Sequence, residues 1–89
     1  MLIAEVKSDG QFRVLETLKE QTRLAADLDD RLLLDANALN KMSVVLRKMR
    51  ETAERFNAQI RCVATHTLRE ARNGIEFAGR LSRLSLIHI

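Results

Sequence analysis

The sequence predicts an α/β fold whose elements follow the order β-β-α-β-α. Three observations lead to this prediction. Two segments of alternating side chains flank a turn near the amino terminus, a long amphipathic helix pattern follows, and a short apolar run then leads into a second helical region. Helices that cross over between strands pack onto the sheet, which is the defining arrangement of α/β proteins.

The first two strands are expected on either side of residues 8–10, whose sequence Ser-Asp-Gly is typical of a tight turn. Residues 2–6 form the first strand. The alternation that begins at Phe12 predicts a second, longer strand that reaches about Leu24 and pairs antiparallel with the first. A helix over residues 15–28 is the competing interpretation, because the leucines there also fit a period of 3.6 residues.

The most regular pattern is an apolar stripe with alternate spacings of three and four residues, made by Leu39, Met42, Leu46, Met49, Ala53 and Phe56. It predicts a long helix with one face on the core. Asp35 is suited to cap its start, because a carboxylate accepts hydrogen bonds from the free N–H groups of the first turn. We expect the helix to end at Asn57.

A candidate ligand site lies at residues 60–73. The apolar run Ile60–Ala64 predicts a strand, and a helical segment follows that ends at residues 73–74 (Asn-Gly). Ligands collect at the carboxyl ends of strands in α/β sheets, where helix N-termini offer N–H groups to anions. Arg69 lies about one turn into the helix. We therefore expect a phosphate-facing corner made by Thr65, Thr67 and Arg69, although threonine caps and a solvated arginine explain the same residues.

The helix after Gly74 and the side chains of Cys62 and His66 are each given a packing role. Ile75, Ala78 and Leu81 are expected to form the apolar line of the helix after Gly74, with Phe77 as a further candidate. Cys62 lies inside the apolar run, where a packing thiol is expected rather than a nucleophile. His66 is expected to be a hydrogen-bonded structural side chain.

No metal site is predicted from the sequence. The aspartates Asp27, Asp29 and Asp30 lack the glycine and the distal glutamate of a calcium loop, so a solvated loop is expected there. His88 has no ligand partner nearby in sequence.

Composition narrows the class of protein. The 89 residues, 46% hydrophobic and 30% charged, suit one small globular domain. Residues 1–45 carry a net charge of −2 and residues 46–89 a net charge of +5. Such a basic half suits a polyanionic partner, but three Phe with no Trp or Tyr offer few rings for base stacking, so nucleic acid is not expected. No run approaches the ~18 apolar residues of a membrane helix, and with no signal peptide a cytoplasmic location is expected.

Residues 64–73, ATHTLREARN, resemble the N-terminal domain of the exopolyphosphatase / guanosine pentaphosphate phosphohydrolase family, in which a strand ending in Ala-Thr leads into such a helix start. The resemblance extends backwards through LIAEV at residues 2–6 and VLETLKEQTRLA at residues 14–25, which look like that family's second and third strands. It covers residues 2–81. Residues 1–81 therefore read as a partial N-terminal phosphatase domain, and residues 82–89 as an unassigned tail that can be foreign to the parent protein.

The resemblance implies a fragment of a ribonuclease H-like (actin-like ATPase) domain that lacks the first strand, the phosphate loops and the catalytic glutamate. It implies hydrolysis of terminal phosphoanhydride bonds in polyphosphate or guanosine pentaphosphate with Mg²⁺, and a homodimer in the full-length protein. No catalytic residue is expected in this chain, so it is predicted to be inactive alone. The residues expected to contact or frame phosphate are Arg69, Thr65, Thr67, Asn73 and, as a weaker candidate, Arg23.

A different class of function is also consistent with these residues. The chain can be a small, non-catalytic module that binds anions or a partner protein through a basic helix face.

Overall fold

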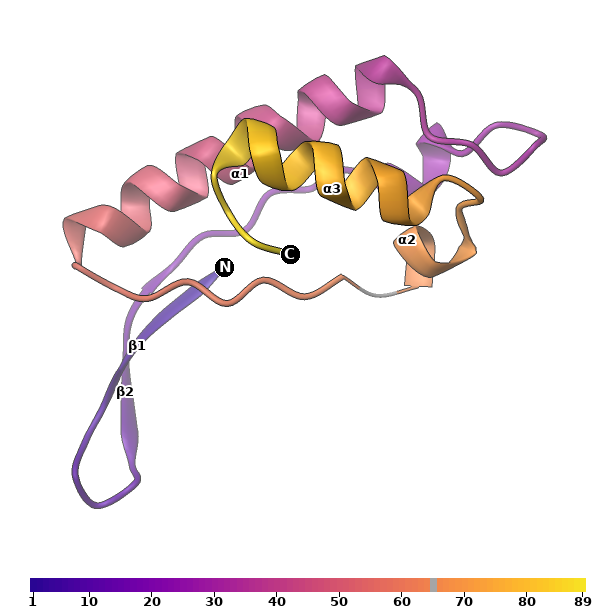
Figure 1. Ribbon diagram of the computed structural model, residues 1–89. Coiled ribbons are helices and arrows are strands. Elements are labelled where there is room, and N and C mark those ends of the chain that lie inside the picture. Colours follow the sequence, from indigo (N-terminus) through magenta and orange to yellow (C-terminus); the bar gives the residue numbers. More distant parts are fainter. Residues whose placement is uncertain (65) are drawn as a thin grey trace.

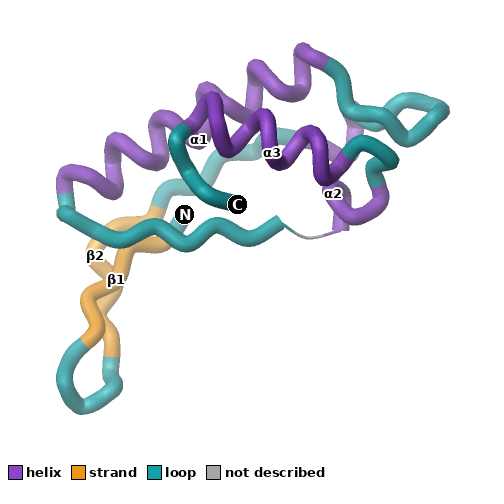
Figure 2. The backbone as a smooth tube through the Cα atoms, in the orientation of Figure 1, coloured by secondary structure: helices purple, strands orange, loops and turns teal. Residues whose placement is uncertain are grey.

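The computed structural model describes residues 1–64 and 66–89, which form a hairpin of two strands and a group of helices (Figure 1). The element order is β1 (Leu2–Val6), β2 (Phe12–Thr17), the 3₁₀ helix η1 (Leu24–Asp27), α1 (Ala36–Arg55), α2 (His66–Glu70) and α3 (Gly74–Ser85). The molecule is elongated, with extents of 48 × 21 × 20 Å, and the hairpin projects from one end (Figure 2). Among the described helices, none combines the length and apolar character needed to cross a membrane.

The predicted hairpin is present, with β1 and β2 antiparallel across a turn in which Gly10 adopts a φ of 84°. The Gly10 backbone N–H donates to the Lys7 carbonyl over 3.0 Å. The second strand is shorter than predicted, because it ends at Thr17 rather than near Leu24. Thr17 pairs with Leu2, the first residue of β1, and the ladder continues only to Leu18, whose N–H donates to the Met1 carbonyl over 2.9 Å. Only η1 is helical within the competing interpretation over residues 15–28.

The long helix is confirmed. The carboxylate of Asp35 accepts a hydrogen bond from the backbone N–H of Ala38 over 2.9 Å, which caps α1 as expected. Asn57, with a φ of 52°, follows the end of the helix. α1 packs along α3, and the buried core is made by Leu34, Ala38, Leu39, Leu46, Ala71, Phe77, Leu81 and Ile87.

The strand predicted at residues 60–64 is not formed. This stretch is a long connection between α1 and α2, and the only sheet of the described chain is the β1–β2 pair (Figure 2). A strand is stabilised by ladder hydrogen bonds to a neighbour, and this segment is hydrogen-bonded into no sheet of the described chain, although its first residues share a hollow with β1. Apolar composition alone therefore does not make it a strand, although Cys62 still packs against the core. The chain remains an α/β fold through its hairpin and helices.

One position of α3 differs from the prediction. Ile75 is 93% exposed, whereas Phe77 and Leu81 are 3% and 2% exposed, so the expected apolar line is wrong at its first position. The reason is the close packing of Gly74 on α2, which sets the orientation of α3. The helix continues to Ser85, and Ile87 packs into the core beyond it.

Candidate functional site

Arg69 is exposed and lies in the last turn of α2. Together with Arg72 it lines an open hollow of about 400 Å³, whose other walls are Ala64, Leu68, Ala71, Gly74, Ile75 and Ala78. No carboxylate is among these lining residues. Two guanidinium groups over an apolar floor can attract and orient a phosphate, because arginine offers a fork of N–H donors.

Arg72 is the residue that the sequence reasoning missed. Its position three residues after Arg69 could have identified it, because side chains at that spacing are neighbours on a helix and in the turn that follows the helix. Its backbone N–H donates to the carbonyl of Leu32 over 2.8 Å, which holds this turn against the loop before α1.

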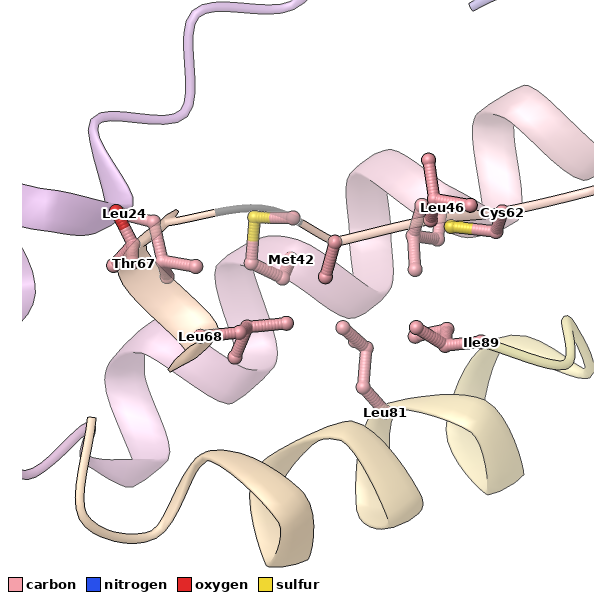
Figure 3. A pocket seen from close by; sticks show the side chains of 10 residues that line it. Leu24, Met42, Leu46, Cys62, Thr67, Leu68, Leu81 and Ile89 are labelled. Atoms are coloured by element: carbon pink, nitrogen blue, oxygen red, sulfur yellow. The ribbon is translucent and has the colours of Figure 1, made fainter. Parts of the chain in front are cut away.

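Thr67 faces a different hollow. It is half-buried and lines an apolar space of about 240 Å³, together with Leu24, Met42, Leu46, Cys62, Val63, Ala64, Leu68, Leu81 and Ile89. Figure 3 shows the Thr67 side chain beside that of Leu24, at one end of this space. The structure therefore does not bring Thr67 and Arg69 to one hollow. Thr65 lies outside the described residues, and so does the side chain of His66.

Cys62 contributes its sulfur to the same apolar space (Figure 3). Burial raises the pKa of the Cys62 thiol, because the surrounding side chains disfavour the thiolate. A protonated thiol packs as a small apolar group and is a poor nucleophile. This agrees with the packing role that its sequence position suggests.

Asn73 holds the turn between α2 and α3 against the start of α1. Its Oδ1 accepts a hydrogen bond from the Leu34 backbone N–H over 3.0 Å, and its Nδ2 donates to the Leu34 carbonyl over 2.8 Å. The side-chain amide thus accepts one hydrogen bond and donates one to the backbone of a single residue, as a paired backbone residue would. We refer to this pair of bonds as the Asn73–Leu34 clamp. The amide supports the turn that carries Arg72, and its hydrogen bonds are directed to protein rather than into the hollow.

At Gly74 the backbones of α2 and α3 approach each other very closely. A Cβ atom placed on Gly74 would lie 1.9 Å from the carbonyl oxygen of Leu68, a distance that no side chain tolerates. Only glycine permits this approach of one backbone to another. The position of Arg69, one residue after Leu68, is therefore fixed by a contact at Gly74.

Arg23 lies apart from this corner. It is exposed, adopts a left-handed φ of 52°, and directly precedes η1. Its neighbour Leu24 reaches the apolar space beside Thr67, whereas the residues that line the Arg69 hollow do not include Arg23. Its assignment as a phosphate-binding residue stays a prediction, as do those of the other candidates.

The acidic loop behaves as a structural loop. The Asp29 carboxylate accepts hydrogen bonds from the backbone N–H groups of Arg31 and Leu33 over 2.8 and 3.0 Å. The Leu33 bond is the main reason that the pKa of Asp29 is lowered. Asp27 forms an ion pair with Lys41 on α1.

No metal-binding cluster is present in the described part of the chain, where no group of three or more His, Cys, Asp or Glu side chains could hold an ion. The residues described do not fit the Mg²⁺ that the family resemblance implies.

The arrangement of the chain is similar to that of a solved protein, the Aquifex aeolicus member of the Ppx/GppA family. The two align with a TM-score of 0.80 and 25% sequence identity over 92% of this chain and 27% of the other. The fold is thus an α/β fragment of the ribonuclease H-like (actin-like ATPase) type, and the chain spans about a quarter of that relative's length. The Ppx/GppA phosphatase family matches residues 2–85. This chain belongs to the Ppx/GppA phosphatase family.

Proposed function

We propose that this chain is part of a phosphoanhydride hydrolase that releases terminal phosphate from inorganic polyphosphate or guanosine pentaphosphate. The observation that carries the proposal is the family match over residues 2–85, which includes the helices that frame the arginine-lined hollow. The chain supplies one wall of the active site, and by itself it is inactive. The assembled enzyme acts in the cytoplasm. The Mg²⁺ that the family resemblance implies would be held by residues outside this chain, where it would supply positive charge to the substrate phosphates.

The role of this wall is to hold phosphate. Arg69 and Arg72 present positive charge at one open hollow, and both belong to elements fixed by backbone contacts rather than to a free loop. Preorganised donors stabilise the spread charge of a transferring phosphoryl group without reorganising during the reaction. Asn73 and Gly74 hold the turn that carries the two arginines, while Thr67 lines the neighbouring apolar hollow.

Binding and turnover are tested separately. Phosphate release from polyphosphate with Mg²⁺ is measured for the 89-residue chain, and polyphosphate binding is measured by equilibrium titration at low and moderate salt. We expect no turnover and weak binding that decreases as salt increases. Replacement Arg69→Ala removes one charge-assisted contact and should weaken binding by about tenfold, and Arg72→Ala by a similar factor.

The matched control is Arg55→Ala, which removes the same charge from the exposed far end of α1 (Figure 1). It should leave binding nearly unchanged, because an exposed charge beyond the Debye length contributes little. Equal losses in Arg55→Ala and Arg69→Ala would show attraction to net charge only and would favour the non-catalytic anion-binding module. Robust turnover by the isolated chain would contradict the proposal that it holds only one wall of the site.

A further inference from the structure

The hollow beside Arg69 and Arg72 is mostly apolar, which a site for phosphate alone does not require. Its other lining residues carry no polar side chain: Ala64, Leu68, Ala71, Gly74, Ile75 and Ala78. We call these six residues the apolar floor. A phosphate chain is bound by cations and N–H donors, and it gains nothing from apolar surface because each of its units is charged and hydrated. The apolar floor therefore suits a ligand that has an apolar part as well as a charge.

Ile75 is the most exposed side chain of the apolar floor. It lies in the first turn of α3 and is 93% exposed, whereas the other floor residues are buried or half-buried. A single exposed isoleucine is ordinary on a protein surface. Ile75 differs because it lines the same hollow as two exposed guanidinium groups, so a ligand attracted by their charge would also cover this side chain.

A flat heterocyclic ring that carries phosphates matches both parts of the hollow. The faces of such a ring stack on apolar side chains and on guanidinium planes, while its phosphates supply the negative charge that arginine attracts. The volume of the hollow, about 400 Å³, is in the range of small-molecule sites.

We propose that this hollow binds a nucleoside polyphosphate, with the base over the apolar floor and the phosphates at Arg69. The proposal rests on the phosphate-binding role proposed above and narrows it, because an inorganic chain can use the arginines but not the floor. Ile75 is then the residue that distinguishes a nucleotide from an inorganic phosphate chain.

The same lining residues do not distinguish one purine from another. Guanine presents two adjacent donors, N1–H and the N2 amino group, and a protein selects it with acceptor groups such as a carboxylate. No carboxylate, amide or hydroxyl side chain is among the described residues that line the hollow. Stacking accepts any base, since every base has a π-face. Adenine and guanine nucleotides should therefore bind with similar affinity.

The test is equilibrium titration of the 89-residue chain with ATP, GTP and linear tripolyphosphate at low salt and without Mg²⁺. All three ligands contain three phosphates, and tripolyphosphate carries the larger charge. We expect ATP and GTP to bind alike, and each about fivefold more tightly than tripolyphosphate, which is the effect of stacking one base.

Ile75→Ser removes the exposed apolar side chain and should weaken ATP and GTP by about fivefold while leaving tripolyphosphate unchanged. Val44→Ser is the matched control, because Val44 is a β-branched side chain on α1 that is 63% exposed and does not line the hollow. It should leave all three ligands unchanged. Ile75→Trp offers a larger stacking surface and should tighten both nucleotides. The chain contains no other tryptophan, so quenching of its fluorescence measures their binding directly.

Arg69→Ala separates this proposal from the phosphate-binding role, since it should weaken all three ligands. If it does, but the nucleotides bind no more tightly than tripolyphosphate or keep their preference in Ile75→Ser, the nucleotide proposal is overturned and the arginine role stands. A marked preference for GTP over ATP overturns the absence of base selection. Failure of all three ligands to bind, or binding that Arg69→Ala leaves unchanged, overturns both proposals.

Discussion

Replacement of Gly74 by alanine should destabilise the chain, although glycine in a helix is normally the weaker choice. The new Cβ would lie 1.9 Å from the Leu68 carbonyl oxygen, and real Cβ contacts essentially never fall below 3.0 Å. The backbones of α2 and α3 must therefore separate by about 1.1 Å. Both elements belong to the packed core, so this movement disturbs the contacts of Ala71 and Phe77.

The magnitude follows from two opposed effects. Overpacking a well-packed site costs about 1–3 kcal/mol. The smaller conformational entropy of alanine in the unfolded chain returns about 0.5–1 kcal/mol. At the middle of these ranges the clash outweighs the entropy gain by about 1 kcal/mol, and the largest net loss of stability is about 2.5 kcal/mol. For a domain of this size, such a loss lowers Tm by roughly 5–15 °C.

Gly79→Ala is the matched control within the same helix. A Cβ at Gly79 would meet the Arg83 Nη1 atom at 3.8 Å, an ordinary contact with the end of a flexible side chain. This variant should therefore gain about 0.5–1 kcal/mol, as expected for a glycine in a helix interior. Thermal unfolding of both variants by circular dichroism measures the difference. If Gly74→Ala melts at or above the temperature of Gly79→Ala, the close approach of α2 and α3 is not present in solution.

Three further predictions use the same unfolding measurement. Asn73→Ala leaves the partly buried N–H and carbonyl of Leu34 without their partner and should cost about 1–3 kcal/mol. Asn73→Asp keeps the acceptor but places a second carboxylate oxygen against the Leu34 carbonyl, so it should not recover that loss. Asp35→Ala removes the cap of α1 and should cost about 1 kcal/mol; no loss would mean that the cap bond is not formed. The pKa of Asp29 is lower in the folded chain, so its carboxylate stabilises the fold above the ordinary carboxyl pKa, and this stability is lost as pH falls through the folded pKa. Asp29→Asn should therefore reduce the decrease of Tm in acid. An unchanged decrease would contradict this prediction.

The sequence patterns correctly predicted the elements whose stability depends on residues nearby in the chain. The stripe of α1 and its Asp35 cap depend on neighbours within a few turns, and the turn at Gly10 depends on its own φ. The strand expected at residues 60–64 failed for the opposite reason, because a strand requires a partner that local sequence does not reveal. The exposure of Ile75 on α3 was missed as well. It is set by the contact of Gly74 with Leu68, and spacing alone assigned Ile75 to the buried side.

The candidate site was predictable to a similar extent. The sequence placed Arg69 about one turn into a helix, which is where α2 has it, whereas its contact with phosphate stays a prediction. The use of the Asn73 amide by Leu34 could not be foreseen, because the two residues are 39 positions apart in the sequence. Thr67 was placed near Arg69 by proximity along the chain, yet the helix directs the two residues to different hollows.

The Asn73–Leu34 clamp also bears on how the molecule opens. It closes a loop that contains α1 and the return segment, so the base of α1 and the α2–α3 turn are expected to come apart in one event. The hairpin lies outside this loop and shares few contacts with the helices, and it can open without them. Amide hydrogen exchange should therefore divide the chain into a slowly exchanging helical unit and a rapidly exchanging hairpin, two cooperative units within one small chain.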